Sequence, residues 1–261
     1  MCSSDLMSFM RFLGINLCEK VPDAKTIWKF KNDLAETETV DKLFCMFDEH
    51  LENKGLISHK GTIVDATFVD APRQRNSRDE NKKIKNGVIP EEWEKPENKS
   101  KLAQKDIDAD WTKKNGERHF GYKDHVKCDA DSKLITNYSV TSASVHDSQR
   151  CLVFIGQEDE VLYADSAYSG KPIALALPEN CKNQICEKGY RNSPLTSEQK
   201  MNNRRKSRIR CRIEHIFGFM TGAMHGITIR SIGITRAWMN IGITNLVYNF
   251  CRYSYLKRAS A

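Results

Sequence analysis

The stretch Gly61-Thr-Ile-Val-Asp-Ala-Thr-Phe-Val-Asp70 predicts the first strand of a sheet, because it is rich in β-branched residues and has turn-like boundaries. Side chains alternate between the two faces of a strand, so Asp65 shares its face with Ile63, whereas Asp70 lies on the other. An ionised carboxylate in such an apolar run is costly to bury unless it meets a cation or hydrogen-bond donors. Asp65 is therefore the candidate functional group, with a structural ion pair to a nearby arginine as the alternative. Asp70 is expected at the turn that ends the strand.

Beyond this strand, the sequence predicts further strands and then helices. The expected elements are, in chain order, strands at 119–126 and 133–140 joined as a hairpin, a helix from His146-Asp147, strands at 160–164 and near 183–186, and helices at 197–222 and 234–254. Three strands, a helix and then alternating strands and helices predict an α/β fold, with a mixed sheet flanked by helices.

Residues 73–117 differ from the rest of the chain in composition. They are dense in Lys, Glu, Asn and Asp, contain Pro90 and Pro96, and include few large apolar side chains. Such a composition is typical of segments that cannot bury a core. It predicts a flexible, polar, exposed insertion after the first strand, with ordered structure resuming at His119.

Residues 1–58 are predicted to form a small all-helical region. A first helix is expected to stop near Gly14, and Pro22-Asp23 is a typical entry and N-cap for a second. Short helices joined by a tight turn indicate a helix-turn-helix DNA reader, with Lys25 and Lys29 as candidate DNA-binding residues. A small helical bundle whose lysines are merely solvated is the alternative.

The overall composition limits the class of protein. The 261 residues are enough for a catalytic domain, here 59–261, with a small helical companion, and 39% hydrophobic residues support a packed core. The 41 Lys and Arg exceed the 34 Asp and Glu, giving a formal charge of +7 that favours polyanionic partners. No apolar run reaches the roughly 20 residues needed to span a bilayer. Scattered cysteines and no secretory signal predict a cytoplasmic protein with reduced thiols and no structural zinc.

Two further carboxylates stand out. Asp165 directly follows the strand at 160–164, and the end of a strand is where open α/β sheets place ligand-binding groups, although Asp is also common at ordinary turns. Glu214 borders the apolar stripe of a helix, and Arg210 lies one turn earlier at the spacing of an ion pair. A surface ion pair is the alternative interpretation of Glu214.

The helix before Glu214 is strongly basic. Residues 200–212 hold seven Lys or Arg and no acid. Neutralising DNA phosphates is the natural use of such a cluster. The candidate DNA-binding residues of this part of the chain are Arg204, Arg205, Arg208 and Arg210, together with Lys123 in the hairpin.

Together, Asp65, Asp165 and Glu214 offer oxygen ligands beside a basic helix. This chemistry suits Mg²⁺ or Mn²⁺ and phosphates. Two such ions roughly 3.5–4 Å apart can activate a water or hydroxyl and stabilise the leaving oxygen of a phosphodiester. The sequence therefore predicts a site for two metal ions, with the three carboxylates as its ligands.

Several strings of the sequence resemble the DDE transposases of bacterial insertion sequences, specifically the insertion-sequence-five group of the insertion-sequence-four-like superfamily. The matching strings are Val64-Asp-Ala-Thr-Phe-Val-Asp-Ala-Pro72, Lys105-Asp-Ile-Asp-Ala-Asp-Trp-Thr-Lys-Lys114, His119-Phe-Gly-Tyr-Lys-Asp-His125, Val145-His-Asp147, Tyr163-Ala-Asp-Ser-Ala-Tyr168, Arg212-Ile-Glu-His-Ile-Phe-Gly218 and Asn245-Leu-Val-Tyr-Asn249. They cover nearly the whole chain in the family's order.

The resemblance implies a ribonuclease-H-like fold in which Asp65, Asp165 and Glu214 are the catalytic and metal-binding triad. Arg210 matches the arginine of the family's tyrosine–arginine–glutamate–lysine signature. Ser207 and Thr221 stand at the tyrosine and lysine positions, so no DNA contact is carried over to them. Relatives usually carry more residues ahead of the N-terminal region, so we expect a shortened chain.

These patterns lead to one functional hypothesis with two alternatives. Asp65 would bridge two Mg²⁺, with Asp165 and Glu214 each holding one, so that water cuts the transposon end and the freed 3′-hydroxyl attacks target DNA. The expected partners are double-stranded terminal and target DNA and a second copy of the chain, on the bacterial nucleoid. A nuclease that cuts without joining, or a remnant that only binds DNA, are the alternatives.

Overall fold

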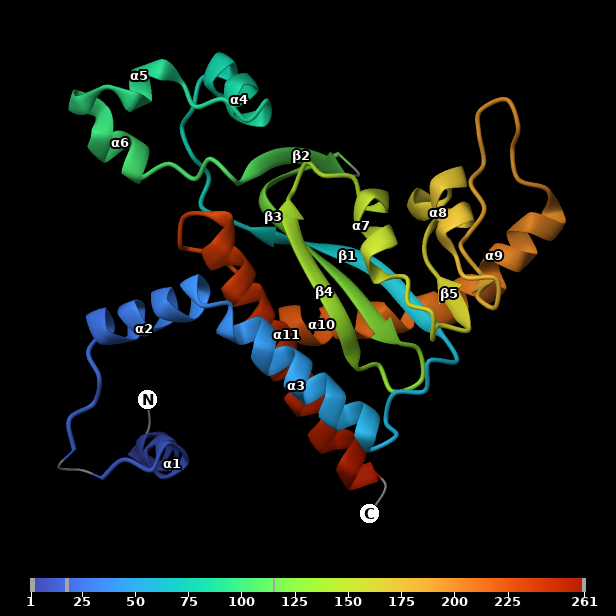
Figure 1. Cartoon of the computed structure of the whole chain (residues 1–261), viewed down its shortest axis with the longest axis horizontal. Helices are drawn as coiled ribbons and strands as arrows, with labels where there is room; N and C mark the ends of the chain where they lie inside the picture. The colour runs from blue at the N-terminus through green and yellow to red at the C-terminus, as the bar shows by residue number, and fades with distance from the viewer. Residues whose placement is uncertain (1–2, 17–18, 115, 260–261) are drawn as a thin grey trace.

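The computed structural model describes residues 3–16, 19–114 and 116–259 (Figure 1). The strands are β1 Thr62–Asp70, β2 Asp110–Lys114, β3 Glu117–Asp129, β4 Ile135–Ser142, β5 Val161–Tyr163 and β6 Lys182–Asn183. The helices are α1 Ser3–Leu13, α2 Ala24–Glu36, α3 Thr39–Asn53, α4 Arg78–Lys85, α5 Glu91–Glu94, η1 Pro96–Asn98, α6 Lys99–Ala103, α7 Ser148–Phe154, η2 Ser166–Tyr168, α8 Lys171–Ala176, α9 Ser197–Arg210, α10 Arg212–Gly222 and α11 Ile234–Ala259. Within the described residues, no helix combines the length and apolarity needed to cross a membrane.

The six strands form one mixed sheet. β1 runs antiparallel to β3 over its whole length, from Thr62 opposite Asp129 to Asp70 opposite Gly121. On its other edge β1 is parallel to β5, which is parallel to β6. The long β3 pairs with β2 near its start and with β4 further along. β1, β2 and β4 all pair antiparallel with β3, and β5 and β6 extend the sheet in parallel from β1. Flanked by helices, these six strands confirm the expected ribonuclease-H-like mixed sheet.

Gly121 explains how β3 passes so close to the end of β1. Its backbone φ is +146°, a conformation that favours glycine. A Cβ at this position would collide with the carbonyl oxygen of Val69 and the backbone nitrogen of Ala71. The motif at 119–125 therefore needs glycine at its third residue for a backbone reason.

Helices cover both faces of the sheet, and β1 contributes to both layers. Ile63 packs into a core with Ile213 and Ile216 of α10 and with residues of α3 and α11. The next residue, Val64, packs into a second core with Phe154 of α7 and Ile173 of α8. Since Asp65 lies two residues after Ile63, its side chain faces α9 and α10, as the strand periodicity predicts.

The segment 73–117 contains more regular structure than its composition predicts. Ser77 and Glu80 form a capping box that starts α4, and Trp93 is fully buried, with its indole N–H donating to Glu80 at 2.8 Å. The expectation that ordered structure resumes only at His119 is wrong, because β2 already pairs with β3. Local composition missed this, since the stabilising contacts join residues far apart within the segment.

The N-terminal helices differ in how they attach. Asp23 caps α2, as predicted, by accepting a hydrogen bond from the Thr26 backbone N–H at 2.7 Å. Figure 1 shows α1 apart from the sheet, whereas α2 and α3 pack against α11. Phe44 of α3 belongs to the same core as the sheet, so packing continues across the boundary predicted at residue 58. A DNA-reading role for this region stays a prediction.

A buried acid between β3 and α11 should make stability depend on pH. Asp124 is completely buried, and burial raises its pKa to about 8 despite a hydrogen bond from Asn245. In the unfolded chain an Asp titrates near pH ~3.9. The folded state therefore keeps a proton that the unfolded state loses, and stability falls as pH rises from about 4 to about 8.

We expect Asp124→Asn to remove this dependence, because asparagine has nearly the same shape and does not ionise. Thermal unfolding measured between pH 5 and 8 should show a smaller fall in Tm for the variant than for the native chain. The two falls should differ by roughly 2–4 °C for each kcal/mol of pH-dependent stability that the substitution removes. Asp33→Asn, at an exposed position on α2, is the control. An unchanged pH dependence in Asp124→Asn would show that this side chain keeps its charge in the folded state.

Candidate active site

Arg210 joins two of the predicted catalytic residues. Its Nη1 donates to Asp65 Oδ2 at 2.8 Å, and its Nη2 donates to Glu214 Oε1 at 2.9 Å. The Asp65 side chain is 15% exposed and that of Arg210 is 20% exposed, so this contact is largely shielded from water. Glu214, at 59%, reaches the same guanidinium from the solvent side.

The local helix geometry places these groups. α9 ends at Arg210 and α10 begins at Arg212, with Cys211 between them still near helical dihedral angles. Arg210 and Glu214 therefore keep the spacing of one helical turn across the joint. Ile213, Ile216 and Met220 are buried against the sheet, which turns Glu214 toward the edge of the site.

Asp165 approaches from the neighbouring strand. It directly follows β5, which is parallel to β1, and its carboxylate accepts a hydrogen bond from the Ala167 backbone N–H at 2.7 Å. Burial disfavours the charge of Arg210, yet the carboxylates of Asp65, Glu214 and Asp165 together raise its pKa. All three predicted acids thus act electrostatically on one guanidinium.

The environment of Asp65 shifts its titration. Burial raises its pKa to about 6, and the nearby charge of Asp165 acts in the same direction. The Ala66 backbone N–H, Arg210 and Lys114 oppose this shift. Asp65 is therefore mostly ionised at neutral pH but depends on nearby cations for its charge, which is the condition expected of a cation ligand.

Two residues of this region were not singled out from the sequence. The Tyr168 hydroxyl is buried with no hydrogen-bond partner among the described residues, and burial together with the charges of Asp65, Asp147 and Asp165 raises its pKa. Lys114, at the end of β2, reaches the Phe68 ring at 5.5 Å and acts on the charge of Asp65. Both residues lie in the quoted motifs, but no local pattern separates them from ordinary strand and turn residues.

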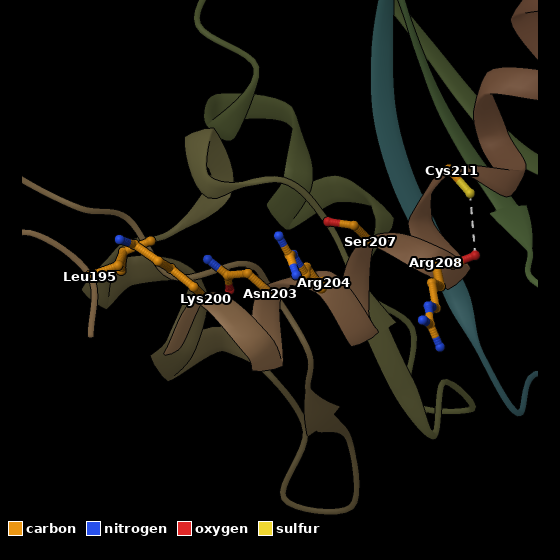
Figure 2. A pocket seen from close by; sticks show the side chains of 7 residues that line it. All are labelled: Leu195, Lys200, Asn203, Arg204, Ser207, Arg208 and Cys211. Carbon is orange, nitrogen blue, oxygen red and sulfur yellow. Dashed lines mark hydrogen bonds between the residues drawn. The ribbon is translucent and has the colours of Figure 1, made fainter. Parts of the chain in front are cut away.

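A basic groove runs along α9, the helix that ends at Arg210 (Figure 2). Its lining residues are Leu195, Lys200, Asn203, Arg204, Ser207, Arg208 and Cys211. Arg204 and Arg208 are exposed, as is Arg205, which does not line the groove. Three of the predicted cations on α9 are therefore presented to solvent, whereas Arg210 is held by the acids.

The other predicted DNA-binding lysines lie elsewhere. Lys123 is buried, and its Nζ bonds to Asp147 Oδ1 at 2.8 Å and to the Val145 carbonyl at 2.6 Å. This internal ion pair gives no support to a phosphate-neutralising role for Lys123, which stays a prediction. Lys25 and Lys29 are exposed on α2, which Figure 1 shows at the opposite end of the molecule from α9.

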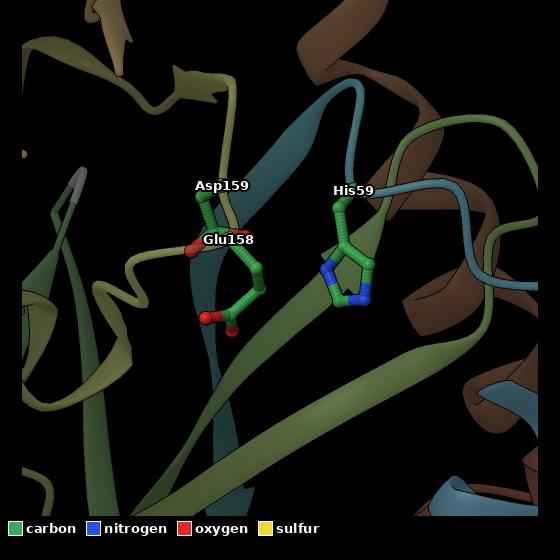
Figure 3. Close-up of side chains that lie close together, drawn as sticks. All are labelled: His59, Glu158 and Asp159. Carbon is green, nitrogen blue, oxygen red and sulfur yellow. The ribbon is translucent and has the colours of Figure 1, made fainter. Parts of the chain in front are cut away.

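A second cluster of possible metal ligands lies outside this site. His59, Glu158 and Asp159 have ligand atoms within 4.8 Å of one another. Figure 3 shows these side chains, which come from the loops before β1 and β5. Lys127 already neutralises it, with Nζ 2.8 Å from Asp159 Oδ2 and 3.6 Å from Glu158 Oε1. Asp159 also accepts hydrogen bonds from Thr62 and Gly156. Its oxygens are therefore fully engaged, which makes this cluster a structural one.

The triad itself is not among the described groups whose ligand atoms all lie within 4.8 Å. Arg210 lies between two of the acids, since its guanidinium binds Asp65 and Glu214 through separate nitrogens. The ion pair considered for Asp65 and the ion pair considered for Glu214 are therefore both present, with Arg210 as their shared partner.

The chain is similar to a known protein family and to a solved structure. A family model described as "Transposase DDE domain" matches residues 57–250. The chain is also similar to a solved structure titled "Cryo-EM structure of piggyBac transposase synaptic complex with hairpin DNA (SNHP)", with 9% identity and a TM-score of 0.38. That match covers 76% of this chain and 48% of the other, so this chain spans about half the length of that protein. Because the family match extends over most of its length, this chain belongs to the family of proteins with a transposase DDE domain.

Proposed function

We propose that this chain is the transposase of a bacterial insertion sequence of the insertion-sequence-five group. It cuts DNA at the ends of its element and joins the freed ends to target DNA in the bacterial cytoplasm. One observation carries this proposal: Arg210 gathers Asp65 and Glu214, beside Asp165, at the end of an exposed basic helix. Membership of the family supports phosphodiester chemistry on DNA.

The donor set fits hard divalent cations. Asp65, Asp165 and Glu214 offer only carboxylate oxygens, and Tyr168 adds a buried hydroxyl without a partner among the described residues. Oxygen ligands of this kind suit Mg²⁺ or Mn²⁺. We propose that the three acids hold two such ions, which when bound activate a water and stabilise the leaving oxygen.

Basic residues of the chain would bind and orient the DNA. Arg204 and Arg208 would neutralise phosphates next to the cut and so fix the strand along α9. Arg210, which contacts both Asp65 and Glu214, would donate a hydrogen bond to a nonbridging oxygen of a phosphate bound next to these acids. Water oxygen forms a bond to phosphorus while the bond to the 3′-oxygen breaks, leaving a 3′-hydroxyl. That hydroxyl then attacks a phosphorus of the target and displaces its 3′-oxygen.

A strand-transfer assay tests the function as a whole. The purified chain is mixed with duplex DNA carrying the terminal inverted repeats of its own element and with a plasmid target, in Mg²⁺ or in EDTA. A transposase gives cut ends and joined products in Mg²⁺ only. Cut ends without joined products would establish a nuclease instead. Salt-sensitive binding without cutting would establish a DNA-binding remnant and overturn the catalytic proposal.

Two copies of the chain are expected to act together, because two DNA ends must be joined in one event. Light scattering on the chain mixed with inverted-repeat DNA reports the stoichiometry of this complex.

A further inference from the structure

A second groove lies between α2 and the loop that joins α10 to α11. Its lining residues are Trp28, Lys31, Asn32, Thr228, Arg230, Ser231, Arg236, Met239 and Asn240. Figure 1 shows α2 and this loop close together at the end of the sheet away from α9. The groove is therefore separate from the one described along α9.

Internal contacts hold the two walls of this groove in place. Arg236 Nε, on α11, donates to Asn32 Oδ1, on α2, at 2.8 Å. The opposite wall is tied to the sheet, because the Ile229 backbone N–H donates to the Asp70 carbonyl at 3.0 Å and the Ile229 side chain is buried. The groove is thus built across the junction between the N-terminal helices and the catalytic fold.

The chemistry of the lining favours an anionic ligand. Lys31 and Arg230 are exposed, and neither forms an ion pair with a described acid. Asn32, Asn240 and Ser231 also line the groove and are held by internal hydrogen bonds. Asn32 donates to Glu36, and Asn240 donates to Ser231 and to the Arg236 carbonyl. The groove has a volume of about 340 Å³, and much of its lining apart from the cations is apolar. Lys31 on one wall and Arg230 on the other suit the repeated phosphates of a nucleic-acid backbone better than a single compact anion.

Duplex DNA is the polyanion that this arrangement fits best. The phosphates of each DNA strand recur along the helix, so they can meet several cations spread over a rigid groove. Trp28 is 60% exposed at the rim, where an amphipathic ring can pack on sugars while Lys31 binds phosphate. Asp70, whose backbone pairs with Thr228, lies five residues along β1 from Asp65, or about 17 Å.

We propose that this groove binds the backbone of duplex DNA at a distance from the phosphate that is cut, through Lys31, Arg230 and Arg236. The proposal rests on the proposed function in that it assumes a DNA substrate. It adds a contact region on the opposite side of the fold from α9. The groove anchors the DNA and leaves the cutting chemistry to the triad.

Salt-dependent binding of a defined probe tests this proposal. The full chain is titrated into a fluorescein-labelled duplex of about 30 base pairs, or three helical turns, in EDTA so that no cutting occurs. Fluorescence anisotropy gives the affinity at several NaCl concentrations from about 50 to 200 mM. The test variant is Lys31→Ala with Arg230→Ala. The matched control is Lys257→Ala with Arg258→Ala, which removes the same charges about 30 Å further along α11.

If the groove binds phosphates, the test variant lowers the slope of log K against log salt by about 1 to 2, since each contact contributes about 0.9. Its affinity near 0.1 M salt falls by about tenfold or more, whereas the control stays close to the native chain. Circular dichroism confirms that both variants are folded. A test variant that binds like its control would overturn this inference.

A third variant separates this inference from the proposed function. Arg204→Ala with Arg208→Ala, on α9, should weaken binding if DNA is the substrate. If it does so while the Lys31 and Arg230 variant does not, only the second groove is refuted. If the native chain shows no salt-dependent binding to the duplex, both proposals fail.

Discussion

Asp65→Asn is expected to reduce Mg²⁺-dependent cleavage of DNA by at least about a thousandfold, equal to about 4 kcal/mol of transition-state stabilisation. The substitution keeps the size of the side chain but replaces one carboxylate oxygen with an amide nitrogen. The amide nitrogen cannot ligate a cation, and the substitution also removes the negative charge that Arg210 neutralises. Cleavage of end-labelled inverted-repeat DNA, followed over time with purified protein, measures the loss.

Asp70→Asn is the matched control for this variant. Asp70 lies on the same strand, but its side chain is 71% exposed and faces away from Arg210. We expect it to cut at nearly the native rate. Both variants should bind duplex DNA in EDTA with about native affinity, because neither removes a cation. Undiminished cutting by Asp65→Asn would refute the assignment of the triad.

Lys127→Met is expected to destabilise the fold by about 3–5 kcal/mol, the usual effect of removing one partner of a buried ion pair. Lys127 and Asp159 are almost completely buried, and their charged atoms lie 2.8 Å apart. Without the ammonium group, Asp159 and the adjacent Glu158 are left without their internal cation. For a chain of this size Tm should fall by about 6–20 °C, at roughly 2–4 °C per kcal/mol, in calorimetry.

Two further variants test the cause of this loss. Lys101→Met removes the cation of a pair with Glu80 in which the lysine is 45% exposed, and it should change stability by less than about 1 kcal/mol. Combining Lys127→Met with Asp159→Asn should recover part of the lost stability, because the second change removes the unpaired charge. A single Lys127→Met variant as stable as Lys101→Met would show that water reaches Asp159.

The sequence was sufficient to predict the strand that carries Asp65 and the face on which it lies. It could not identify the partner of Asp65, because Arg210 lies 145 residues away and is one of seven cations in a short run. Only the packing of α10 on the sheet selects it. Asp65 forms the structural ion pair that was the alternative interpretation. This pair is compatible with a functional role for Asp65, since a shielded carboxylate needs a counter-charge whenever no metal ion is bound.

Burial of charged residues was the least predictable feature. Lys123 follows Gly121 and Tyr122 in a motif whose sequence is compatible with either an exposed or a buried strand. The structure buries it against the segment that leads into α7, where the Val145 carbonyl and the Asp147 carboxylate accept hydrogen bonds from its ammonium group. In the same way, Trp93 is hidden by α4 and α6, whose composition is that of a solvated segment. Contacts of this kind depend on long-range topology and leave no local pattern.

The break between α9 and α10 at Cys211 links the position of the basic helix to the position of the acids. One residue separates α9, which carries the exposed cations, from α10, which carries Glu214, and Arg210 is the last residue before it. Under the proposed function, DNA held along α9 acts on the helix whose last residue pairs with both Asp65 and Glu214. A change in the tilt of α9 would therefore move this guanidinium relative to both acids, so we expect DNA binding and the geometry of the acids to be coupled.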